Sequence, residues 1–323
     1  AWSCVKTADM DKDGDIDIVS SVTTLFENDG AGNFSTKWTY SAANNSHVLL
    51  ADVNRDSYLD YIHSFLTPQL SITYGYLDGY PIDPGYYYNQ LTLGAAAGHI
   101  NKDGIIDFFA VNGATKETIA FTGDSSYDYT PASIASHSNP YFVLSADFNR
   151  DFLADCVTLN KGLGTTADIM MNDGTGSFTA GQQLSSGVGL NSGCLGDVDN
   201  DGDVDLILGT LAGGPSLLYR YDHTLDTFGA LNPGDMPSDT HRTESLALAD
   251  LDQDGDLDLI LGNHNADNSI YLNTGIGVFT DSGYSFGNSS STQWIAVADL
   301  DNDGDLDIIF ADLNDNLSIY FCN

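Results

Sequence analysis

A short aspartate-rich stretch recurs along the whole chain. Four near-identical copies read DMDKDGDIDI from Asp9, DVDNDGDVDL from Asp197, DLDQDGDLDL from Asp250 and DLDNDGDLDI from Asp299. Three weaker copies, DVNRDSYLD, HINKDGIID and DFNRDFLAD, begin at Asp52, His99 and Asp147. The seven starts are 43 to 53 residues apart. A regular period of this length over residues 1–323 indicates a single repeat domain without an internal boundary.

Each repeat contains the same series of short apolar segments. One precedes the acidic stretch and another follows it, as in Trp294–Ala298 and Leu306–Ala311 of the last repeat. A third ends in a turn such as LFENDGAGNF, IMMNDGTGSF or IYLNTGIGVF. In these turns Asn, Asp and Gly supply the positive φ angles that tight hairpins require. A less regular fourth segment leads to the next repeat, but the last repeat stops after its third segment.

Seven units of four strands predict an all-β fold, a seven-bladed β-propeller of four-stranded antiparallel blades whose last blade has three strands. Closure of such a ring protects the edges of its sheets. No window has the apolar period of a helix. A parallel β-helix is the alternative for repeated acidic turns, but its rungs are much shorter than these units.

The acidic stretches have the ligand spacing of a calcium loop. Side chains at positions 1, 3, 5 and 9 and the backbone carbonyl at position 7 would supply the oxygen ligands that Ca²⁺ prefers. Glycine at position 6 permits the turn that brings them together. An EF-hand starts in the same way, but it requires Glu at position 12 and flanking helices, which are missing here. A solvated acidic turn without metal is the alternative, and four intact copies in register favour the metal.

We therefore expect four calcium sites in the intact copies. Their residues are Asp9, Asp11, Asp13, Asp15 and Asp17; Asp197, Asp199, Asp201, Asp203 and Asp205; Asp250, Asp252, Asp254, Asp256 and Asp258; and Asp299, Asp301, Asp303, Asp305 and Asp307.

The weaker copies are expected to bind calcium less well or not at all. Two of them have Asn at position 3, lack the glycine, and carry Arg55 or Arg150 at position 4, which would lower the negative potential of the loop. Their candidate ligands are Asp52, Asn54, Asp56, Tyr58 and Asp60, and Asp147, Asn149, Asp151, Leu153 and Asp155. The copy at His99 keeps only Asp103 and Asp107 as carboxylates, so we expect a turn without an ion.

Charge and composition limit the partners and the compartment. The chain has 46 acidic and 10 basic residues, for a formal charge of −36, which disfavours nucleic acids and anionic membrane surfaces. No apolar run approaches the ~18 residues of a membrane span. Calcium modules of this kind suit extracellular calcium concentrations, and the start AWSC fits a processed chain. We expect a secreted or cell-surface protein, with candidate glycosylation sites at Asn33, Asn44, Asn288 and Asn316.

Four cysteines allow three disulfide pairings. A bond between Cys4 and Cys322 would tie the two ends of the ring, and one between Cys156 and Cys194 would link the fourth and fifth blades. Buried thiols and other pairings are the alternatives. A natural chain that continues past Asn323 would be another way to complete the last blade.

The unit ADLDQDGDLDLILGN…SIYLNTGIGVF resembles the FG-GAP/VCBS repeat family. The resemblance spans the chain and is specific in the D-x-D-x-D-G-x-x-D core. It implies a calcium-bearing propeller like those of integrin α-subunit heads and some fungal lectins, which serve mostly in extracellular recognition, adhesion or scaffolding. The Gly-Trp and His-x-Arg motifs of those lectins are absent before the acidic loops, where TQWIAVAD, NSHVLLAD and NPYFVLSAD stand. No sugar site is therefore carried over, and an integrin is not expected, because residues 1–323 include no leg domains.

Long polar segments rich in tyrosine, at 76–90, 123–141 and 221–244, are expected on the face opposite the acidic loops. Such a composition suits adaptable polar contact around aromatic platforms. The candidate ligand-binding residues are Tyr86, Tyr87, Tyr88, Tyr127 and Tyr129. The alternative is that these tyrosines pack their own loops. Trp38 and Trp294 are expected to pack between blades.

These observations favour a secreted, non-enzymatic recognition module, either lectin-like or adhesive, whose partner is a glycan or an extracellular protein. A structural subunit that self-associates in an extracellular assembly is the first alternative. A polysaccharide-active enzyme is the second, although the chain has no nucleophile elbow, P-loop or paired histidine motif.

Overall fold

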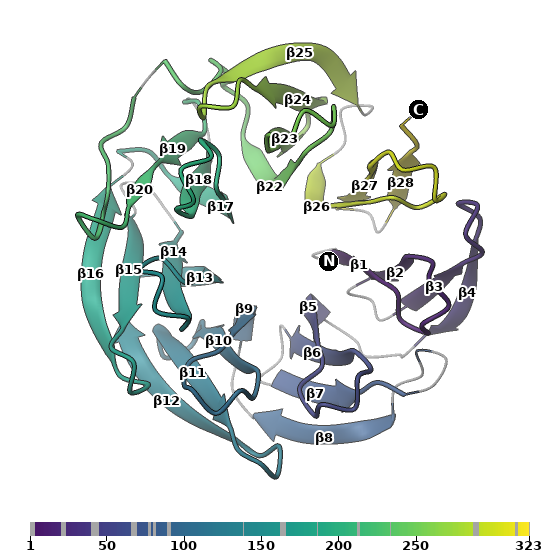
Figure 1. The fold of residues 1–323 in the computed structure, drawn as a ribbon, viewed down its shortest axis with the longest axis vertical. Helices are drawn as coiled ribbons and strands as arrows, with labels where there is room; N and C mark the ends of the chain where they lie inside the picture. Colours follow the sequence, from purple (N-terminus) through teal and green to yellow (C-terminus); the bar gives the residue numbers. More distant parts are fainter. Residues whose placement is uncertain are drawn as a thin grey trace.

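The computed structural model describes residues 4–20, 24–39, 45–65, 70–76, 79, 82–88, 92–137, 139–161, 166–185, 187–211, 214–232, 234–286, 291–313 and 316–322. These residues form β-strands and no α-helix. Among the same residues, no helix is long and apolar enough to cross a membrane. The strands form seven antiparallel blades around a central axis (Figure 1), which confirms the predicted seven-bladed propeller.

Each blade is a meander in which sequence neighbours pair, with its first strand nearest the axis (Figure 1). Blade 1 contains β1 (Val5–Ala8), β2 (Asp17–Ser20), β3 (Thr24–Asn28) and β4 (Phe34–Thr39), and blade 2 contains β5 (Asn45–Ala51), β6 (Asp60–Phe65), β7 (Leu70–Tyr74) and β8 (Ile82–Tyr88). Blade 3 contains β9 (Thr92–Gly98), β10 (Asp107–Asn112), β11 (Glu117–Gly123) and β12 (Tyr129–Ser136), and blade 4 contains β13 (Pro140–Ala146), β14 (Asp155–Asn160), β15 (Thr166–Asn172) and β16 (Phe178–Ser185).

The last three blades are less uniform. Blade 5 contains β17 (Leu190–Gly196), β18 (Asp205–Thr210), β19 (Leu217–Tyr219) and the small hairpin β20 (Tyr221–Asp222) and β21 (Thr227–Phe228). Blade 6 contains β22 (Thr243–Ala249), β23 (Asp258–Asn263), β24 (Asn268–Asn273) and β25 (Phe279–Phe286), and blade 7 contains β26 (Thr292–Ala298), β27 (Asp307–Asp312) and β28 (Leu317–Tyr320). The three-stranded last blade was predicted. The expected four-stranded sheet is wrong for blade 5, where β20 and β21 pair only with each other.

Buried side chains fill every boundary between neighbouring blades. The second strand of a blade faces a neighbour on both sides, and β10, β14, β18, β23 and β27 are buried at every position. This is why the segments after the acidic stretches are almost continuously apolar. One cluster joins the last blade to the first, with Leu300 and Ile309 packed against Val5 and Ile18. The ring is therefore closed by the same hydrophobic packing that joins its other blades.

The predicted disulfides are wrong: none of the four cysteines, all of which lie in the described part of the chain, forms one. The chain begins near the axis and ends farther out in blade 7 (Figure 1). Cys4 packs with Val48 between blades 1 and 2, whereas Cys322 follows the third strand of blade 7. Cys156 faces blade 3, and Cys194 lies on the side of blade 5 that packs against blade 6. Members of each proposed pair therefore lie in different parts of the ring.

Other predicted residues can be placed individually. Trp38 packs between blades 1 and 2 as expected, with its ring centroid 5.4 Å from that of Tyr61. Asn33 and Asn316 are exposed, as glycosylation would require. Asn44 and Asn288 lie outside the described residues.

Candidate metal sites on one face of the ring

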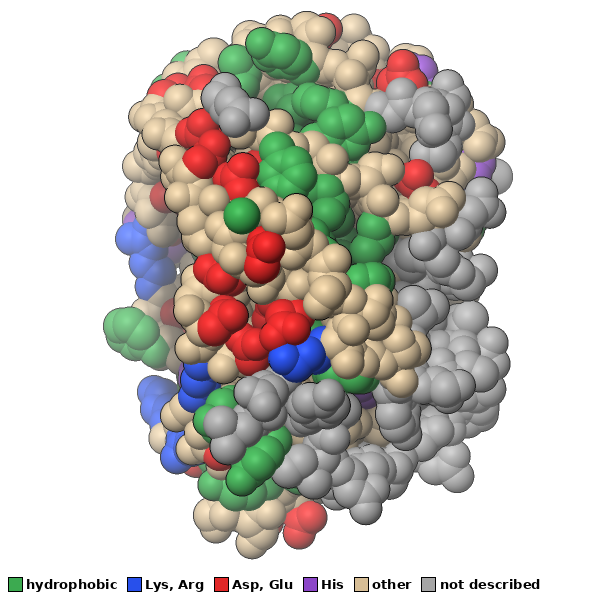
Figure 2. All heavy atoms as spheres, turned by 90° about the vertical axis from the view of Figure 1, so that its right-hand side faces the viewer, with side chains coloured by type: hydrophobic (Ala, Val, Ile, Leu, Met, Phe, Trp, Pro, Cys, Tyr) green, Lys and Arg blue, Asp and Glu red, His purple; other side chains and the backbone are tan. Residues whose placement is uncertain are grey.

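The acidic loops join the first strand of each blade to the second. Because the first strands all run in the same direction along the axis, the loops lie on one face of the ring. Seen from the side of the first and last blades, acidic side chains gather in clusters with few Lys or Arg among them (Figure 2). Four groups offer three carboxylate oxygens within 4.8 Å of one another: Asp9, Asp11 and Asp13; Asp250, Asp252 and Asp254; Asp299, Asp301 and Asp303; and Asp197, Asp199 and Asp205.

The aspartate at position 1 holds the loop in its turn through a hydrogen bond to the backbone. Oδ2 of Asp299 accepts a hydrogen bond from the N–H of Gly304 at 3.0 Å, and Gly304 has φ of 96°, which favours glycine. Asp9 and Asp250 make the same contact in their loops. In all three, Oδ1 is buried and has no hydrogen-bond partner among the described residues. A buried carboxylate oxygen without a partner is costly, so these loops fit a bound cation.

Position 9 is aspartate in all seven loops, and it has a structural role that needs no ion. Oδ2 of Asp307 accepts the N–H of Leu300 at 2.8 Å, and Oδ1 accepts the N–H of Cys322 at 3.0 Å. The same pair of contacts, to position 2 of the loop and to the end of the third strand, recurs at Asp17, Asp60, Asp107, Asp155, Asp205 and Asp258. Position 9 was predicted only as a ligand, but these contacts give Asp107 a structural role even in the weak loop at His99.

Burial opposes ionisation of these carboxyl groups. Loss of water raises the pKa of Asp60 and of Asp205 to about 7 and that of Asp155 to about 6. Burial, followed by the charges of Asp13 and Asp17, raises the pKa of Asp11 to about 6. A cation in a loop would favour the ionised carboxylates and reverse this shift.

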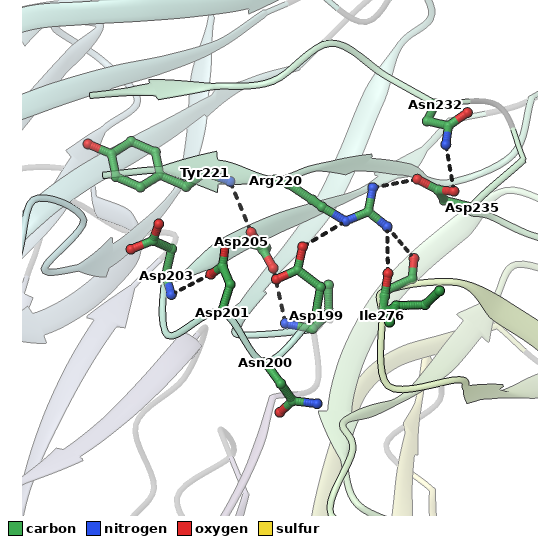
Figure 3. Close-up of polar contacts among 12 residues, drawn as sticks. Asp199, Asn200, Asp201, Asp203, Asp205, Arg220, Tyr221, Asn232, Asp235 and Ile276 are labelled. Atoms are coloured by element: carbon green, nitrogen blue, oxygen red, sulfur yellow. Dashed lines mark hydrogen bonds and ion pairs between the residues drawn. The ribbon is translucent and has the colours of Figure 1, made fainter. Parts of the chain in front are cut away.

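The loop at Asp197 differs from the other three strong loops because Arg220 of the same blade contacts the aspartate at position 3. Nε of Arg220 lies 3.1 Å from Oδ2 of Asp199, and Nη1 lies 2.5 Å from Oδ2 of Asp235 (Figure 3). Both oxygens of Asp197 accept backbone N–H groups, so, among the described residues, the unpartnered buried oxygen of this loop is Oδ1 of Asp199, at position 3, and not an oxygen at position 1. Arg220 lies outside the motif, and no sequence signal placed it here. Its guanidinium would compete with a cation for Asp199, so we expect weaker binding than in the other three loops.

The two loops with Asn at position 3 satisfy their oxygens internally. Oδ1 and Oδ2 of Asp52 accept the N–H groups of Asp56 at 3.1 Å and Ser57 at 2.9 Å. Asp147 makes the equivalent pair of bonds. Weak or absent calcium binding in these loops stays a prediction, and the internal hydrogen bonds supply a physical reason for it.

At most blade boundaries, the side chain at position 4 of one acidic loop contacts the side chain at position 7 of the next loop. The contacts are Arg150 Nη2 to Asp203 Oδ1 at 2.7 Å, Asn200 Nδ2 to Asp256 Oδ1 at 2.6 Å, Gln253 Nε2 to Asp305 Oδ1 at 2.5 Å and Asn302 Nδ2 to Asp15 Oδ1 at 2.8 Å. Where position 7 is Tyr58, position 4 of the preceding loop is Lys12, whose Nζ lies 3.9 Å from the ring centroid. These side chains connect successive candidate sites.

The contacts of position 4 with the following loop correct the prediction made for Arg55 and Arg150. Both charges were expected to act on the loops that contain them. Arg150 instead pairs with Asp203 in the following loop, and Nη2 of Arg55 donates to the carbonyl oxygen of Gly104 in the following loop. Both residues have positive φ, 59° and 62°, which directs the side chain across the blade boundary.

A second set of blade contacts comes from buried asparagines at the ends of third strands. Nδ2 of Asn28 donates to the carbonyl oxygen of Leu300, at position 2 of the last loop, at 2.7 Å. Asn172 and Asn273 donate in the same way to Ile100 and Val198 of their preceding blades. These are the asparagines of the NDG and NTG turns. They were predicted only as hairpin residues, although an asparagine recurs at the same place in all three turns.

The structure does not gather the five candidate tyrosines in loops opposite the acidic face. Tyr86, Tyr87 and Tyr88 lie in the outer strand β8, and Tyr127 lies in the β11–β12 turn on the acidic face. Tyr129 is only 4% exposed, and its hydroxyl donates to the carbonyl oxygen of Ile106. The predicted placement is wrong because segments 76–90 and 123–141 contain fourth strands. The side chains of Tyr86 and Tyr87 are outside the described part.

Fold and site together define a seven-bladed β-propeller whose acidic loops, on one face, offer clustered carboxylates to a metal ion. Residues 197–261 and 250–310 match the FG-GAP-like repeat. No curated protein sequence matches the chain.

Solved structures with the same fold are distant in sequence. Two crystal structures of BBS1N in complex with ARL6DN, soaked with mercury and with lead, give TM-scores of 0.67 and 0.66 at 8% and 9% identity. In both, the likeness covers 98% of this chain and 90% of the other. At this identity the likeness shows the fold alone.

Proposed function

We propose that the protein is a calcium-stabilised, non-enzymatic module that binds a protein partner in the extracellular space. The observation that carries the calcium assignment is the buried, unpartnered Oδ1 at position 1 of three loops, Asp9, Asp250 and Asp299. Each lies beside two more carboxylates of the same loop. Clustered carboxylates without soft ligands suit Ca²⁺, and weak sites of this kind are filled at extracellular concentrations.

Large apolar side chains are exposed on the acidic face, and they support a protein partner. Phe152 is 88% exposed, Leu225 70% and Ile276 65%, and all three lie in loops or turns on this face. Phe152 has φ of 69° at the position where the strong loops carry glycine. An exposed phenylalanine in this strained conformation contributes nothing to the core, so a role in contact is the physical reason to retain it.

The chemistry of this face indicates the kind of partner. Apolar side chains surrounded by carboxylates suit a partner surface with apolar residues among basic ones. BBS1N, which shares the fold, is in complex with ARL6DN, and this supports protein binding as a use of the architecture. A lectin-like or adhesive role fits the same module. A self-associating structural subunit is the alternative that the exposed apolar residues also favour.

The experiment has two parts. Equilibrium dialysis with metal analysis should find calcium bound to the wild type, with less bound after Asp299→Asn; the position-matched control Asp147→Asn should change little. The triple variant F152S/L225S/I276S should lose binding on an array of extracellular proteins while retaining its melting temperature. Retained protein binding would place the interface elsewhere. Binding to glycans alone would favour the lectin role, and release of sugars from a polysaccharide would contradict a non-enzymatic module.

A further inference from the structure

The first strands of all seven blades surround a cavity of ≈ 410 Å³ on the axis of the ring. This volume lies within the ~300–1,000 Å³ that is usual for small-molecule sites. The cavity is separate from the acidic loops, and an inference about it does not depend on the proposed function.

Irregular backbone places extra side chains around this cavity. In β13, β17, β22 and β26 the pairing with the second strand shifts by one residue near the start of the strand. The residues omitted from the pairing are Tyr141, Asn191, Glu244 and Gln293, and all four line the cavity. Bulges that recur at one place in a fold redirect side chains and are frequent beside binding sites.

Aromatic rings from three blades meet across the channel. The ring centroid of Trp294 in blade 7 lies 5.0 Å from that of His47 in blade 2 and 6.0 Å from that of Phe142 in blade 4. Small residues, including Ala95 and Gly193, contribute to the remaining wall. A flat apolar group could therefore stack on these aromatic rings, and the small residues leave space for it.

The cavity carries an uncompensated positive charge in a very acidic protein. Nζ of Lys6 lies 4.9 Å from the ring centroid of Trp294, and Lys6 forms no ion pair with any carboxylate in the described part of the chain. Glu244 also lines the cavity, but its charge is compensated. Its carboxylate lies 2.8 Å from Nε of Arg242 and 2.9 Å from Nδ1 of His264, and it accepts a hydrogen bond from Asn191.

Two buried polar atoms at the cavity lack partners. Nδ1 of His47, a residue only 3% exposed, has no hydrogen-bond partner among the described residues, and neither has the hydroxyl oxygen of Tyr141. Burial, assisted by Lys6, lowers the pKa of His47 to about 3, so its imidazole is neutral at physiological pH. Buried polar groups are almost always paired in native proteins, so these two atoms are available to hydrogen-bond a group bound in the cavity.

We propose that the central cavity binds a small organic acid, a carboxylate on a flat apolar body. The carboxylate pairs with Lys6, and the body packs against Trp294 and Phe142. His47 and Tyr141 offer polar atoms that can complete the site. A cation is disfavoured because Glu244, the carboxylate that lines the cavity, is already paired.

Calorimetric titration of the calcium-saturated protein with 2-naphthoate and with its uncharged amide, 2-naphthamide, tests this proposal. The carboxylate should bind at least about tenfold more tightly, because only it pairs with Lys6. Lys6→Gln should abolish that difference, and Trp294→Leu should weaken both compounds. The control Lys37→Gln, whose ammonium pairs with Glu27 in blade 1, should leave both affinities unchanged.

Equal affinity of the wild type for the two compounds would overturn the proposal, as would a carboxylate preference that survives in Lys6→Gln. Absence of binding by either compound at millimolar concentration would also overturn it. The comparison of the two compounds on the wild type stands even if a variant fails to fold.

Discussion

Asn302, in the last blade, donates a hydrogen bond from Nδ2 to Oδ1 of Asp15, in the first blade, at 2.8 Å. The same geometry joins Asn200 to Asp256 in the middle of the chain at 2.6 Å. The two ends of the ring are therefore joined like its internal boundaries, by this contact, by Asn28 and by a hydrophobic cluster. This closure replaces the disulfide that the cysteine positions led us to expect.

Asn302→Ala should weaken the closure of the ring. We expect a loss of about 1 kcal/mol in the free energy of unfolding, as is typical for one hydrogen bond. Hydrogen exchange should accelerate in β1 and β28. The equivalent substitution Asn200→Ala is the control, because it leaves the junction between the chain ends intact and should accelerate exchange near blades 5 and 6 instead. Identical exchange patterns in the two variants would contradict this account.

Removal of divalent ions should lower the melting temperature. A loop saturated at ~100 times its dissociation constant contributes ~2.7 kcal/mol to the folded state, and without the ion its carboxylates repel one another. Thermal melts in EDTA and in millimolar calcium provide the comparison. An unchanged melting temperature would exclude the calcium assignment.

Arg220→Gln should strengthen calcium binding but destabilise the metal-free protein. Loss of the guanidinium frees Asp199, so calcium affinity at this loop should rise by about tenfold. The same change removes the ion pair with Asp235 and should lower the melting temperature in EDTA. Calorimetric calcium titrations and melts measure the two effects. Arg55→Gln serves as the control, because Arg55 contacts no carboxylate of a strong loop.

Asp107→Asn should destabilise the protein whether or not calcium is present. Asp107 is fully buried and accepts N–H groups of Ile100 at 2.8 Å and Gly123 at 2.9 Å, and an Asn amide nitrogen cannot accept the second bond. We expect a loss of about 2 kcal/mol. Asp103→Asn, in the same loop but exposed, should have little effect. Denaturant unfolding in EDTA and in calcium distinguishes this structural role from metal ligation, because a ligand would matter only with the ion.

The metal-free protein should lose stability as pH rises from about 4 to about 7. Burial raises the pKa of Asp60 and of Asp205 to about 7 in the folded state, whereas an unfolded aspartate titrates near ~3.9. In this window the folded state binds more protons than the unfolded state, so ionisation opposes folding. Calcium binds the ionised carboxylates, so in its presence the loss of stability with rising pH should become smaller or reverse. Melts at pH 4.5 and 7.5, each with EDTA and with calcium, check the sign.

The periodic motif was sufficient to predict the number of blades and the face that carries the loops. The seven acidic stretches and the apolar segments beside them depend on local spacing, which sequence displays directly. The fourth strand of blade 5 was mispredicted because its replacement by the β20–β21 hairpin follows no repeated pattern. The tyrosine-rich segments were misplaced because β8 and β12 are outer strands, whose mixed composition resembles that of loops.

Contacts between blades could not be predicted from one sequence. Arg220 of blade 5 donates to the carbonyl oxygens of Ile276 and Gly277 in blade 6, and nothing in the motif marks these contacts. Arg150 acts on the following loop because its positive φ directs it there. The central cavity is lined by residues at β-bulges, and no pattern in the sequence marks these residues.

The aspartates at position 9 allow an acidic loop to fold whether or not it binds an ion. Because Asp107 holds its turn with backbone amides alone, a blade can lose its metal ligands and still fit its neighbours. Natural variation can therefore remove divalent binding from one repeat and keep it in the next. The four intact and three weaker loops of this chain fit such independence of one loop from the next.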